Sequence, residues 1–516
     1  MEKIQNSQTN NISANNKRIA KNTMYLYIRM FLILIVSLFT SRVILQVLGA
    51  SDYGIYNIIG GVVVLFSFIN GALTAATQRY LNFYIGRNDM QKTHDVFCMS
   101  MNAYIVLSIV FLILAETIGL WFVNTQLNIP DGRMYAANWI YQFTVFSFML
   151  NLTRIPYNAS LIAYEKMDFY AYLSLLDVIL KLGIVYLLYI SPIDKLIAYG
   201  FLFMLTDLVD NLIYRIYCKR KFKTARYHWV WDKKLFKELL SFSGWSLFGN
   251  AASVAVQQGL NILVNIFYGV TLNAALGIAN QVASSVVKFF SNFQTAFNPQ
   301  IVKYYAEGKN EEFYKLIFRA SRISYYLMFI ISLPLALQID TVLNIWLVEV
   351  PKYTGIFCQL ILLFYLMEAI MTPLWMAVQA TGKIKTYQIL VSTVNFLNLP
   401  FIYLFLKFGY PVWSVWLIRV IIDIFIYIVR CLYLKRKVSL SLRLYYREVL
   451  QPVILTTIFA LPIPLIFEEV TKVYWINFIG SIVLSIACTS FAILYFGLKK
   501  NERNKLTAMI FRFVKK

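Results

Sequence analysis

The sequence predicts an all-α polytopic integral membrane protein of about 14 transmembrane helices, and three observations indicate this class. Of the 516 residues, 59% are apolar and only 14% are charged, whereas soluble proteins average about 45–50% apolar and about 25% charged residues. Apolar runs of about twenty residues or more recur along the whole chain, and each can cross a bilayer as a helix. Lys and Arg outnumber Asp and Glu by 48 to 25, and they gather in the connectors between alternate runs.

The predicted spans are apolar runs bounded by polar or charged residues. A helix rises about 1.5 Å per residue, so even about 19 residues cover about 28 Å, close to the ~30 Å hydrocarbon core. Residues 1–22 are polar, and the following run of about 25 residues is too long for a cleaved signal peptide, so we expect it to stay as an anchor. The expected spans are 24–48, 55–85, 97–123, 134–163, 169–190, 195–217, 238–268, 274–303, 319–339, 354–380, 386–408, 411–434, 449–467 and 475–498.

The distribution of Lys and Arg predicts that both termini are cytoplasmic. An even number of spans puts the termini on one side, and cytoplasmic loops carry the excess of basic residues. Topology therefore explains most of the net charge of +23, and no nucleic-acid partner is expected. The predicted outside connectors are short and hold only four basic residues, Arg133, Lys195, Lys352 and Lys472.

An internal repeat divides the predicted helices into two lobes of six. Both copies start inside, so the repeat is parallel, which is a common plan among transporters; an inherited duplication without a transport role is the alternative. The matched pairs include Gly86 and Gly308, Pro156 and Pro373, Tyr170 and Tyr387, and Asp207 and Asp423.

The predicted domains follow from this repeat. The two six-helix lobes are joined by a basic cytoplasmic linker whose main expected role is to anchor the orientation of the chain. The basic tail has apolar residues at helical spacing and is expected to lie on the inner leaflet. In order, the domains are 1–22, a polar cytoplasmic N-terminus; 23–217, the N-lobe; 218–237, the linker; 238–437, the C-lobe; 438–498, two further spans; and 499–516, the tail.

Cysteine and histidine usage argues against an enzyme. The five cysteines stand singly, so neither a disulfide framework nor a thiolate metal site is expected. His94 and His228 fall in short polar connectors, and we expect solvated loop residues there rather than a general base or zinc ligands. No catalytic residue, metal or cofactor is therefore predicted.

Basic residues inside the predicted spans indicate an anion site. An Arg or Lys at mid-membrane costs about 2.5–3.5 kcal/mol on insertion scales and usually faces a bundle interior or an aqueous cavity. Each member of the set lacks a carboxylate three or four positions away, although a partner on a neighbouring helix or a misplaced span boundary would also explain it. The set consists of Arg42, Arg79, Arg154 and Lys288, with Arg29 nearer the end of its span.

Acidic and amide side chains inside the spans suggest two further roles. Asp177 and Asp423 have basic residues four positions away, Lys181 and Arg419, which allows local neutralisation. The candidates for binding a coupling proton or sodium ion are Asp177, Asp207, Glu368 and Asp423, and Glu116 and Asp210 also lack a close partner. Polar stripes on two successive helices suit either sugar hydroxyls or interhelical hydrogen bonds, and they include Asn250, Gln257, Asn261 and Asn280.

The N-terminal third of the chain carries a family resemblance. Residues 17–86 contain Leu48-Gly49, then Asp52-Tyr53-Gly54, and Gln78-Arg79-Tyr80 near the end of the second span. This stretch resembles Wzx-type O-antigen and polysaccharide flippases, which belong to the multidrug/oligosaccharidyl-lipid/polysaccharide exporter superfamily. The layout of six, six and two spans is similar to that family across the whole chain.

The resemblance implies both an architecture and a cargo. It implies a V-shaped pair of six-helix lobes whose central cationic cavity takes the pyrophosphate of an undecaprenyl-linked oligosaccharide. Alternating access would then reorient this glycan, an O-antigen, capsule or exopolysaccharide unit, across the bacterial inner membrane. Implied partners are the undecaprenyl-pyrophosphate-linked glycan, membrane lipids, a polysaccharide polymerase and glycosyltransferases.

Two alternatives remain open at this point. A multidrug cation antiporter of the same fold would place Asp177, Asp207 or Glu368 at its centre. A glycan polymerase or ligase acting on the same lipid would require a sizeable outside loop with catalytic residues, and the sequence predicts no such loop.

Overall fold

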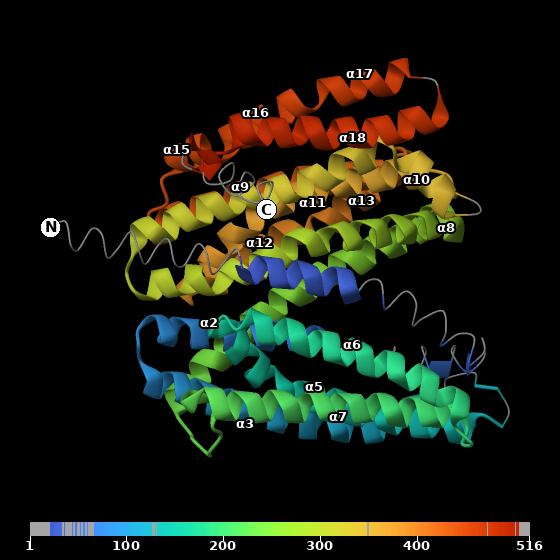
Figure 1. The fold of residues 1–516 in the computed structure, drawn as a ribbon, viewed down its shortest axis with the longest axis vertical. Helices are drawn as coiled ribbons and strands as arrows, with labels where there is room; N and C mark the ends of the chain where they lie inside the picture. Colours follow the sequence, from blue (N-terminus) through green and yellow to red (C-terminus); the bar gives the residue numbers. More distant parts are fainter. Residues whose placement is uncertain are drawn as a thin grey trace, which may run out of the picture. The chain divides into compact units, whose positions relative to one another are not determined.

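A computed structural model describes residues 21–33, 67–125, 129–130, 132–347, 350–471, 473–500 and 502–504, with single residues between 36 and 59. These residues are organised as helices joined by short turns, and none of them lies in a strand (Figure 1). Within this part of the chain, nine helices are long and apolar enough to cross a membrane. The predicted class, an all-α polytopic membrane protein, is confirmed.

The chain forms two compact units. Unit 1 comprises Met1–Asn250 and Val302–Gly308, and unit 2 comprises Ala251–Ile301 and Lys309–Lys516. Unit 1 therefore continues past the linker 218–237, because the first turns of the next helix pack against earlier helices of the same unit.

Unit 1 is built around α5, which packs on α7, α2 and α3, while α6 packs on α7. Asp89, Asp194 and Asp232 precede α3, α7 and α8, and each accepts hydrogen bonds from backbone N–H groups of the first turn, as N-cap residues do. Residues 21–33 are helical, and the other elements are α2 (Ser67–Gly86), α3 (Met90–Leu114), a π-helical turn (Ala115–Gly119), α4 (Leu120–Thr125), α5 (Met134–Ala163), α6 (Met167–Ile190), α7 (Lys195–Lys221), a 3₁₀ turn (Lys223–Ala225) and the start of α8 (Lys233–Ala306).

The helical element α8 covers both the seventh and the eighth predicted spans. The backbone of α2 lies beside Asn250 at Gly71 and against Lys303 at Gly86. Those two points on α2 are about 22 Å apart, whereas a straight helix from residue 250 to 303 would extend about 80 Å. The α8 chain therefore reverses direction between these residues, as two spans joined by a short connector require.

Unit 2 is built around α11, which packs on α9 and α14, and α18 packs on α9, α16 and α17. Two predicted spans are each divided into two helices, close to Pro400 and at Pro462, because proline removes a backbone donor and crowds the preceding turn. The elements are α9 (Asn310–Leu337), α10 (Ile339–Trp346), α11 (Thr354–Thr381), α12 (Lys385–Phe396), α13 (Asn398–Lys407), α14 (Ser414–Val438), α15 (Leu442–Tyr445), a π-helical turn (Tyr446–Leu450), α16 (Gln451–Ala460), α17 (Pro462–Val470), α18 (Tyr474–Ala492) and a π-helical turn (Ile493–Gly497).

The turns after α5 and α11 each contain a residue in the left-handed backbone conformation, at matching positions of the predicted repeat. Glu165 has φ of 58° and Gly382 has φ of 74°, and these residues occupy matching positions in the two copies. Gly382 adopts this left-handed conformation without steric cost. Glu165 is not glycine, and its buried carboxylate is paired with Lys303 at 2.7 Å.

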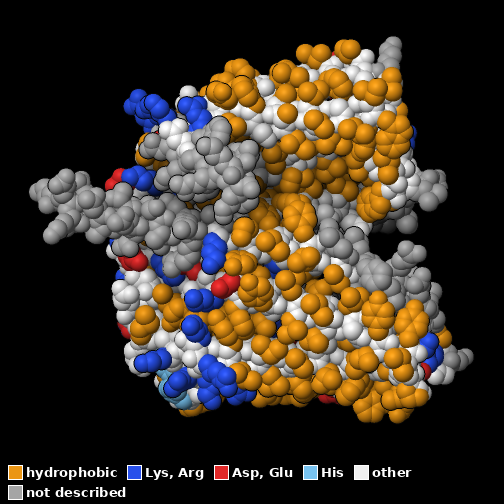
Figure 2. Space-filling view, in the orientation of Figure 1, with side chains coloured by type: hydrophobic (Ala, Val, Ile, Leu, Met, Phe, Trp, Pro, Cys, Tyr) orange, Lys and Arg blue, Asp and Glu red, His pale blue; other side chains and the backbone are white. Residues whose placement is uncertain are grey.

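The surface of unit 1 separates apolar from basic side chains. Figure 2 shows apolar side chains over the middle of its helices and Lys and Arg gathered at one end, where the α2–α3 turn and the linker lie in Figure 1. Soluble monomers rarely expose apolar patches larger than a few hundred Å². This surface fits a chain whose outer face meets lipid.

Candidate functional site

The interior of unit 1 contains an ion pair between α5 and α7. Arg154 Nη1 lies 3.4 Å from Asp210 Oδ2, and a second guanidinium nitrogen donates to Asn151 Oδ1 on the preceding turn. Of the explanations left open for Arg154, a partner on a neighbouring helix is therefore the one present. The partner stands on a neighbouring helix, which the search for acidic residues three or four positions away does not detect.

A second guanidinium of unit 1 belongs to the helix 21–33. Arg29 lies over the Tyr170 ring with 4.5 Å from Cζ to the ring centroid. Its Nε has no hydrogen-bond partner among the described residues. Tyr214 on α7 has Arg154 at 5.5 Å and interacts electrostatically with both arginines. Tyr214 is therefore an electrostatic neighbour of two half-buried guanidinium groups.

Two further carboxylates join this network. Asp207 is 5% exposed and accepts a hydrogen bond from Asn151 Nδ2 at 3.5 Å. Lys181 Nζ lies 2.8 Å from Asp177 Oδ1 on the same helix, so the pairing expected from their spacing is present. Polar side chains of α5, α6 and α7 thus form one mixed network of acids and bases inside unit 1.

The remaining predicted cations lie elsewhere. Arg79 on α2 is 7% exposed. Its guanidinium lies over the rings of Tyr80 and Phe83, at 4.4 and 4.7 Å from their centroids, and it interacts electrostatically with Glu238. Lys288 is exposed on the part of α8 that belongs to unit 2. Arg42 lies outside the described residues.

The predicted amide stripe has mixed surroundings. Asn250 is exposed, and Asn280 is half-buried. Gln257 Oε1 accepts a hydrogen bond from Arg419, and Asn261 Nδ2 donates to Gln258 Oε1 at 3.3 Å. At Gln257, therefore, the stripe forms an interhelical hydrogen bond, which is one of the two roles that the sequence suggested for these amides beside sugar binding.

Unit 2 holds its own buried acid–base cluster. Asp423 is 4% exposed and interacts electrostatically with Glu368, Arg419 and Arg430. Besides its bond to Gln257, Arg419 lies over the Phe364 and Trp416 rings at 4.6 and 4.8 Å. Asp423, four residues further along the same helix, is thus one of several groups that interact with Arg419. The cluster extends over α8, α11 and α14.

The cluster in unit 2 includes a second arginine of α14. Arg430 is buried, with Nε donating to Tyr387 Oη at 2.6 Å and Nη1 donating to Met371 O at 2.9 Å. In the repeat, Tyr387 matches Tyr170, which carries Arg29 in unit 1. Each unit therefore holds a guanidinium against the matching tyrosine, although a different helix supplies it.

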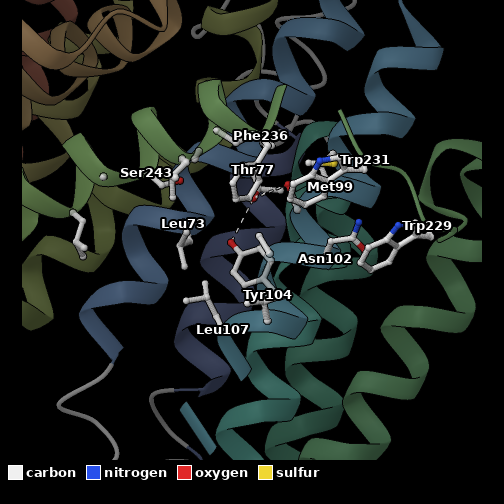
Figure 3. Close-up of a pocket in the computed structure, with 18 residues that line it drawn as sticks. Leu73, Thr77, Met99, Asn102, Tyr104, Leu107, Trp229, Trp231, Phe236 and Ser243 are labelled. Atoms are coloured by element: carbon white, nitrogen blue, oxygen red, sulfur yellow. Dashed lines mark hydrogen bonds between the residues drawn. The ribbon is translucent and has the colours of Figure 1, made fainter. Parts of the chain in front are cut away.

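An apolar cavity of about 440 Å³ lies in unit 1 between α2, α3, the linker and the start of α8 (Figure 3). Three of its polar side chains interact with one another, since Thr77 Oγ1 donates to Ser100 Oγ at 3.3 Å and lies 3.4 Å from Tyr104 Oη. The linker closes one side with Trp229 and Trp231. This lining lacks charged groups and is suited to apolar matter.

The histidines differ from the sequence-based expectation. His94 is buried at 9% exposure, and its Nε2 lies 2.6 Å from Nε2 of His228 in the linker. Cys98 Sγ lies 3.5 Å from the same His94 nitrogen. The expectation of a solvated loop residue is therefore wrong for His94, which begins the interior face of α3. The four-residue spacing of His94 and Cys98 was the available signal.

Ion pairs join the connectors that precede α5 and α7 in unit 1. Arg133 pairs with both Asp52, from the Asp-Tyr-Gly motif, and Asp194, the N-cap of α7. Burial raises the pKa of Asp194, but hydrogen bonds from Arg133 and from two backbone N–H groups outweigh it and hold that pKa below its ordinary value. The motif residue Asp52 therefore has a structural role at this end of the unit.

No protein-family model and no curated protein matches this sequence. Solved structures do match it. The chain is similar to the crystal structure of a MATE point mutant, with a TM-score of 0.71 and 14% identity over 82% of this chain and 96% of the other. The chain therefore has the MATE transporter fold. An outward-facing multidrug resistance MATE family transporter of the MOP superfamily gives a TM-score of 0.69 at 14% identity with the same coverage of both chains.

A third similar structure bears on the site. It is a MOP superfamily transporter from Pyrococcus furiosus Vc1 (DSM3638), with a TM-score of 0.66 and 13% identity over 82% of this chain and 96% of the other. The reverse polarity of that protein's binding pocket suggests a different function for it. Chains with this fold thus differ in the polarity of their binding pockets. The fold alone therefore does not determine what a transporter carries, and the side chains of its pocket do.

Proposed function

We propose that this protein is a membrane transporter that moves undecaprenyl-pyrophosphate-linked oligosaccharide units across the bacterial inner membrane by alternating access. The MATE fold and the resemblance of residues 17–86 to Wzx-type flippases support a transporter of this superfamily. The observation that carries the cargo is that Arg29 and Arg154 both interact electrostatically with Tyr214 in unit 1, with Arg154 over its ring and Arg29 over the ring of Tyr170.

The chemistry of these two arginines suits a pyrophosphate. A guanidinium presents several N–H donors in a plane and binds phosphate oxygens by paired, charge-assisted hydrogen bonds. Arg29 is half-buried and the side chain of Arg154 is 27% exposed, so each presents part of its side chain to a ligand. The neighbouring amide and hydroxyl groups, such as Asn151, can bind sugar hydroxyls.

The ion pair of Arg154 also provides a route to coupling. A pyrophosphate that binds Arg154 competes with the Asp210 carboxylate, which lies at 3.4 Å. A buried carboxylate that loses its cation is costly unless it takes up a proton or another cation. Cargo binding at Arg154 is thus linked to ion binding at Asp210, with Asp177 and Asp207 in the same network and Glu368 and Asp423 in unit 2 as further candidates.

A multidrug cation antiporter is the second candidate, and one observation favours it. Asp207 and Asp210 are buried at 5% and 3% exposure, and Asp210 Oδ1 has no hydrogen-bond partner among the described residues. A buried carboxylate with unused acceptor capacity can bind an organic cation. The two candidates differ in which side chains the cargo requires.

The test compares surface polysaccharide and dye resistance in the same strains. The gene is deleted from its host, and the deletion is complemented with wild type, Arg29→Gln, Arg154→Gln or the control Lys315→Gln, whose exposed lysine pairs with Glu311 on the surface of α9. One lost hydrogen bond to a charged group costs about 1.5–3 kcal/mol, so each interior variant is expected to lower polysaccharide export about 10- to 100-fold.

Matched expression of each variant is verified by blotting membranes. Lys315→Gln is expected to export polysaccharide like wild type. Unchanged surface polysaccharide in the deletion strain, together with a gain of ethidium sensitivity, would contradict the flippase proposal and support the antiporter.

A further inference from the structure

One face of α3 holds the linker through a series of side chains at four-residue spacing. His94 Nδ1 donates to Thr224 O at 3.0 Å, and Cys98 Sγ lies 3.8 Å from Arg226 O. Asn102 uses both ends of its amide, donating to Val230 O at 2.9 Å and accepting from Tyr227 Oη at 2.8 Å. The linker therefore runs along this face, and His228 stands opposite the two side chains that bear metal-binding atoms.

The hydrogen bond to Thr224 fixes the tautomer of His94. A carbonyl only accepts, so Nδ1 must carry the proton, and in the neutral ring Nε2 keeps its lone pair. His228 Nε2 lies 2.6 Å from His94 Nε2, and Cys98 Sγ lies beside the same ring, 3.5 Å from Nε2 and 3.9 Å from Nδ1, so the His94 ring must turn to aim this lone pair at an ion shared with Cys98. Orientation of one ring nitrogen by a backbone carbonyl is the arrangement that metal-binding histidines use.

The three atoms are close to the spacing that a metal ion requires. With Zn–N near 2.0 Å and Zn–S near 2.3 Å, a tetrahedral site separates sulfur from nitrogen by about 3.6 Å and two nitrogens by about 3.3 Å. The Cys98–His94 distance agrees with the first value. The ligand atoms of His94, Cys98 and His228 all lie within 4.8 Å of one another, so the exposed His228 ring must shift for the three atoms to reach this spacing.

We propose that His94, Cys98 and His228 bind one transition-metal ion of the zinc class and that this ion fastens the linker to α3. These are the only two histidines of the chain, and they belong to segments 134 residues apart. Thiolate and imidazole ligands favour Zn²⁺ or Cu⁺ over Mg²⁺ or Ca²⁺. Three protein ligands leave a fourth position for water.

The site adjoins the apolar cavity of unit 1. Trp229 and Trp231, which follow His228, line that cavity together with Met99 and Asn102 from α3 (Figure 3). An ion bound at His228 fixes the part of the linker that directly precedes Trp229 and Trp231. It therefore also holds the two indole rings in place. Metal binding therefore orders one wall of the cavity as well as the connection into α8.

The experiment measures Zn²⁺ binding to the full chain, purified in detergent without a polyhistidine tag. Equilibrium dialysis is expected to give one Zn²⁺ per chain, retained against millimolar Mg²⁺. Loss of a group that merely supports a metal ligand weakens binding about 10- to 100-fold, and loss of a ligand is expected to weaken it at least as much. Cys98→Ser and His228→Gln are the test variants, and Cys488→Ser on α18 is the control.

The test variants are chosen to fold. Serine at position 98 keeps a donor for Arg226 O, and His228 is exposed. A second readout uses trypsin, which cleaves after the exposed Arg226. Zn²⁺ is expected to slow this cleavage in wild type and in Cys488→Ser, but not in Cys98→Ser. Absence of stoichiometric Zn²⁺ from wild type, or unchanged Zn²⁺ affinity in both test variants, would overturn the proposal, whatever the transport assay shows.

Discussion

At the scale of single residues, the interior of each unit is organised by arginines and their partners. Arg154 pairs with Asp210 across two helices, Arg430 bonds Tyr387 and a backbone carbonyl, and Arg29 lies on Tyr170. Such groups are stable in a bilayer because a partner replaces the water they lose. The spacing of residues along one helix predicts partners only on that helix, which is why Lys181 with Asp177 was foreseen and Arg154 with Asp210 was not.

The buried pair of Lys303 and Glu165 allows a stability prediction. Glu165 has a fully buried side chain and Lys303 lies 2.7 Å away with 12% exposure. Removing one partner of a buried pair leaves an uncompensated charge and costs about 3–5 kcal/mol. Lys303→Met is therefore expected to lower the free energy of unfolding by that amount, measured by thermal or denaturant unfolding in detergent. Lys315→Met breaks an exposed pair and is expected to leave the free energy of unfolding nearly unchanged; equal losses for the two variants would contradict this account.

At the scale of elements, most helices follow from local properties of the sequence. Apolar length predicts α5, α6, α7, α11 and α14 because the bilayer fixes how long a span must be. The divided helices α12–α13 and α16–α17 depend on Pro400 and Pro462, whose effect on an otherwise continuous apolar run the length argument ignores. Contacts between segments were beyond prediction, since nothing near His94 in the sequence indicates that His228 lies beside it.

The turn after α11 provides a test of the repeat at this scale. Gly382 has φ of 74°. Replacing glycine by alanine at a compatible site raises the free energy of unfolding by roughly 0.4–1 kcal/mol, whereas at a positive φ the same replacement lowers it by more than that. Gly382→Ala is therefore expected to lower the midpoint of thermal unfolding. Gly183→Ala in α6, where a Cβ meets nothing within 4 Å, is the matched control and is expected to leave that midpoint unchanged or raise it. The same sign for both substitutions would count against the turn geometry.

At the scale of the whole molecule, the chain has a helical fold of the MATE type, and we propose that it carries an anionic, lipid-linked cargo. The all-α membrane class was predictable from hydropathy, because the length and polarity of each apolar run are local properties of the chain. The two-copy organisation stays a prediction from matched residues, and the anion site stays a proposal. Arg29 and Arg154 both interact with Tyr214 in unit 1, while Arg79 lies among aromatic rings and Lys288 is exposed on α8.

The measurement that tests the central claim most directly is transport by the purified protein in liposomes. The cargo is an undecaprenyl-pyrophosphate-linked oligosaccharide, and the readout is its transfer from one leaflet to the other, followed with a lectin outside the vesicles. Wild type and Lys315→Gln are expected to transfer the glycolipid, with Arg29→Gln and Arg154→Gln slower by about 10-fold or more, as expected for one lost charged hydrogen bond each. Equal rates in all four proteins, or transfer no faster than in protein-free liposomes, would contradict the account.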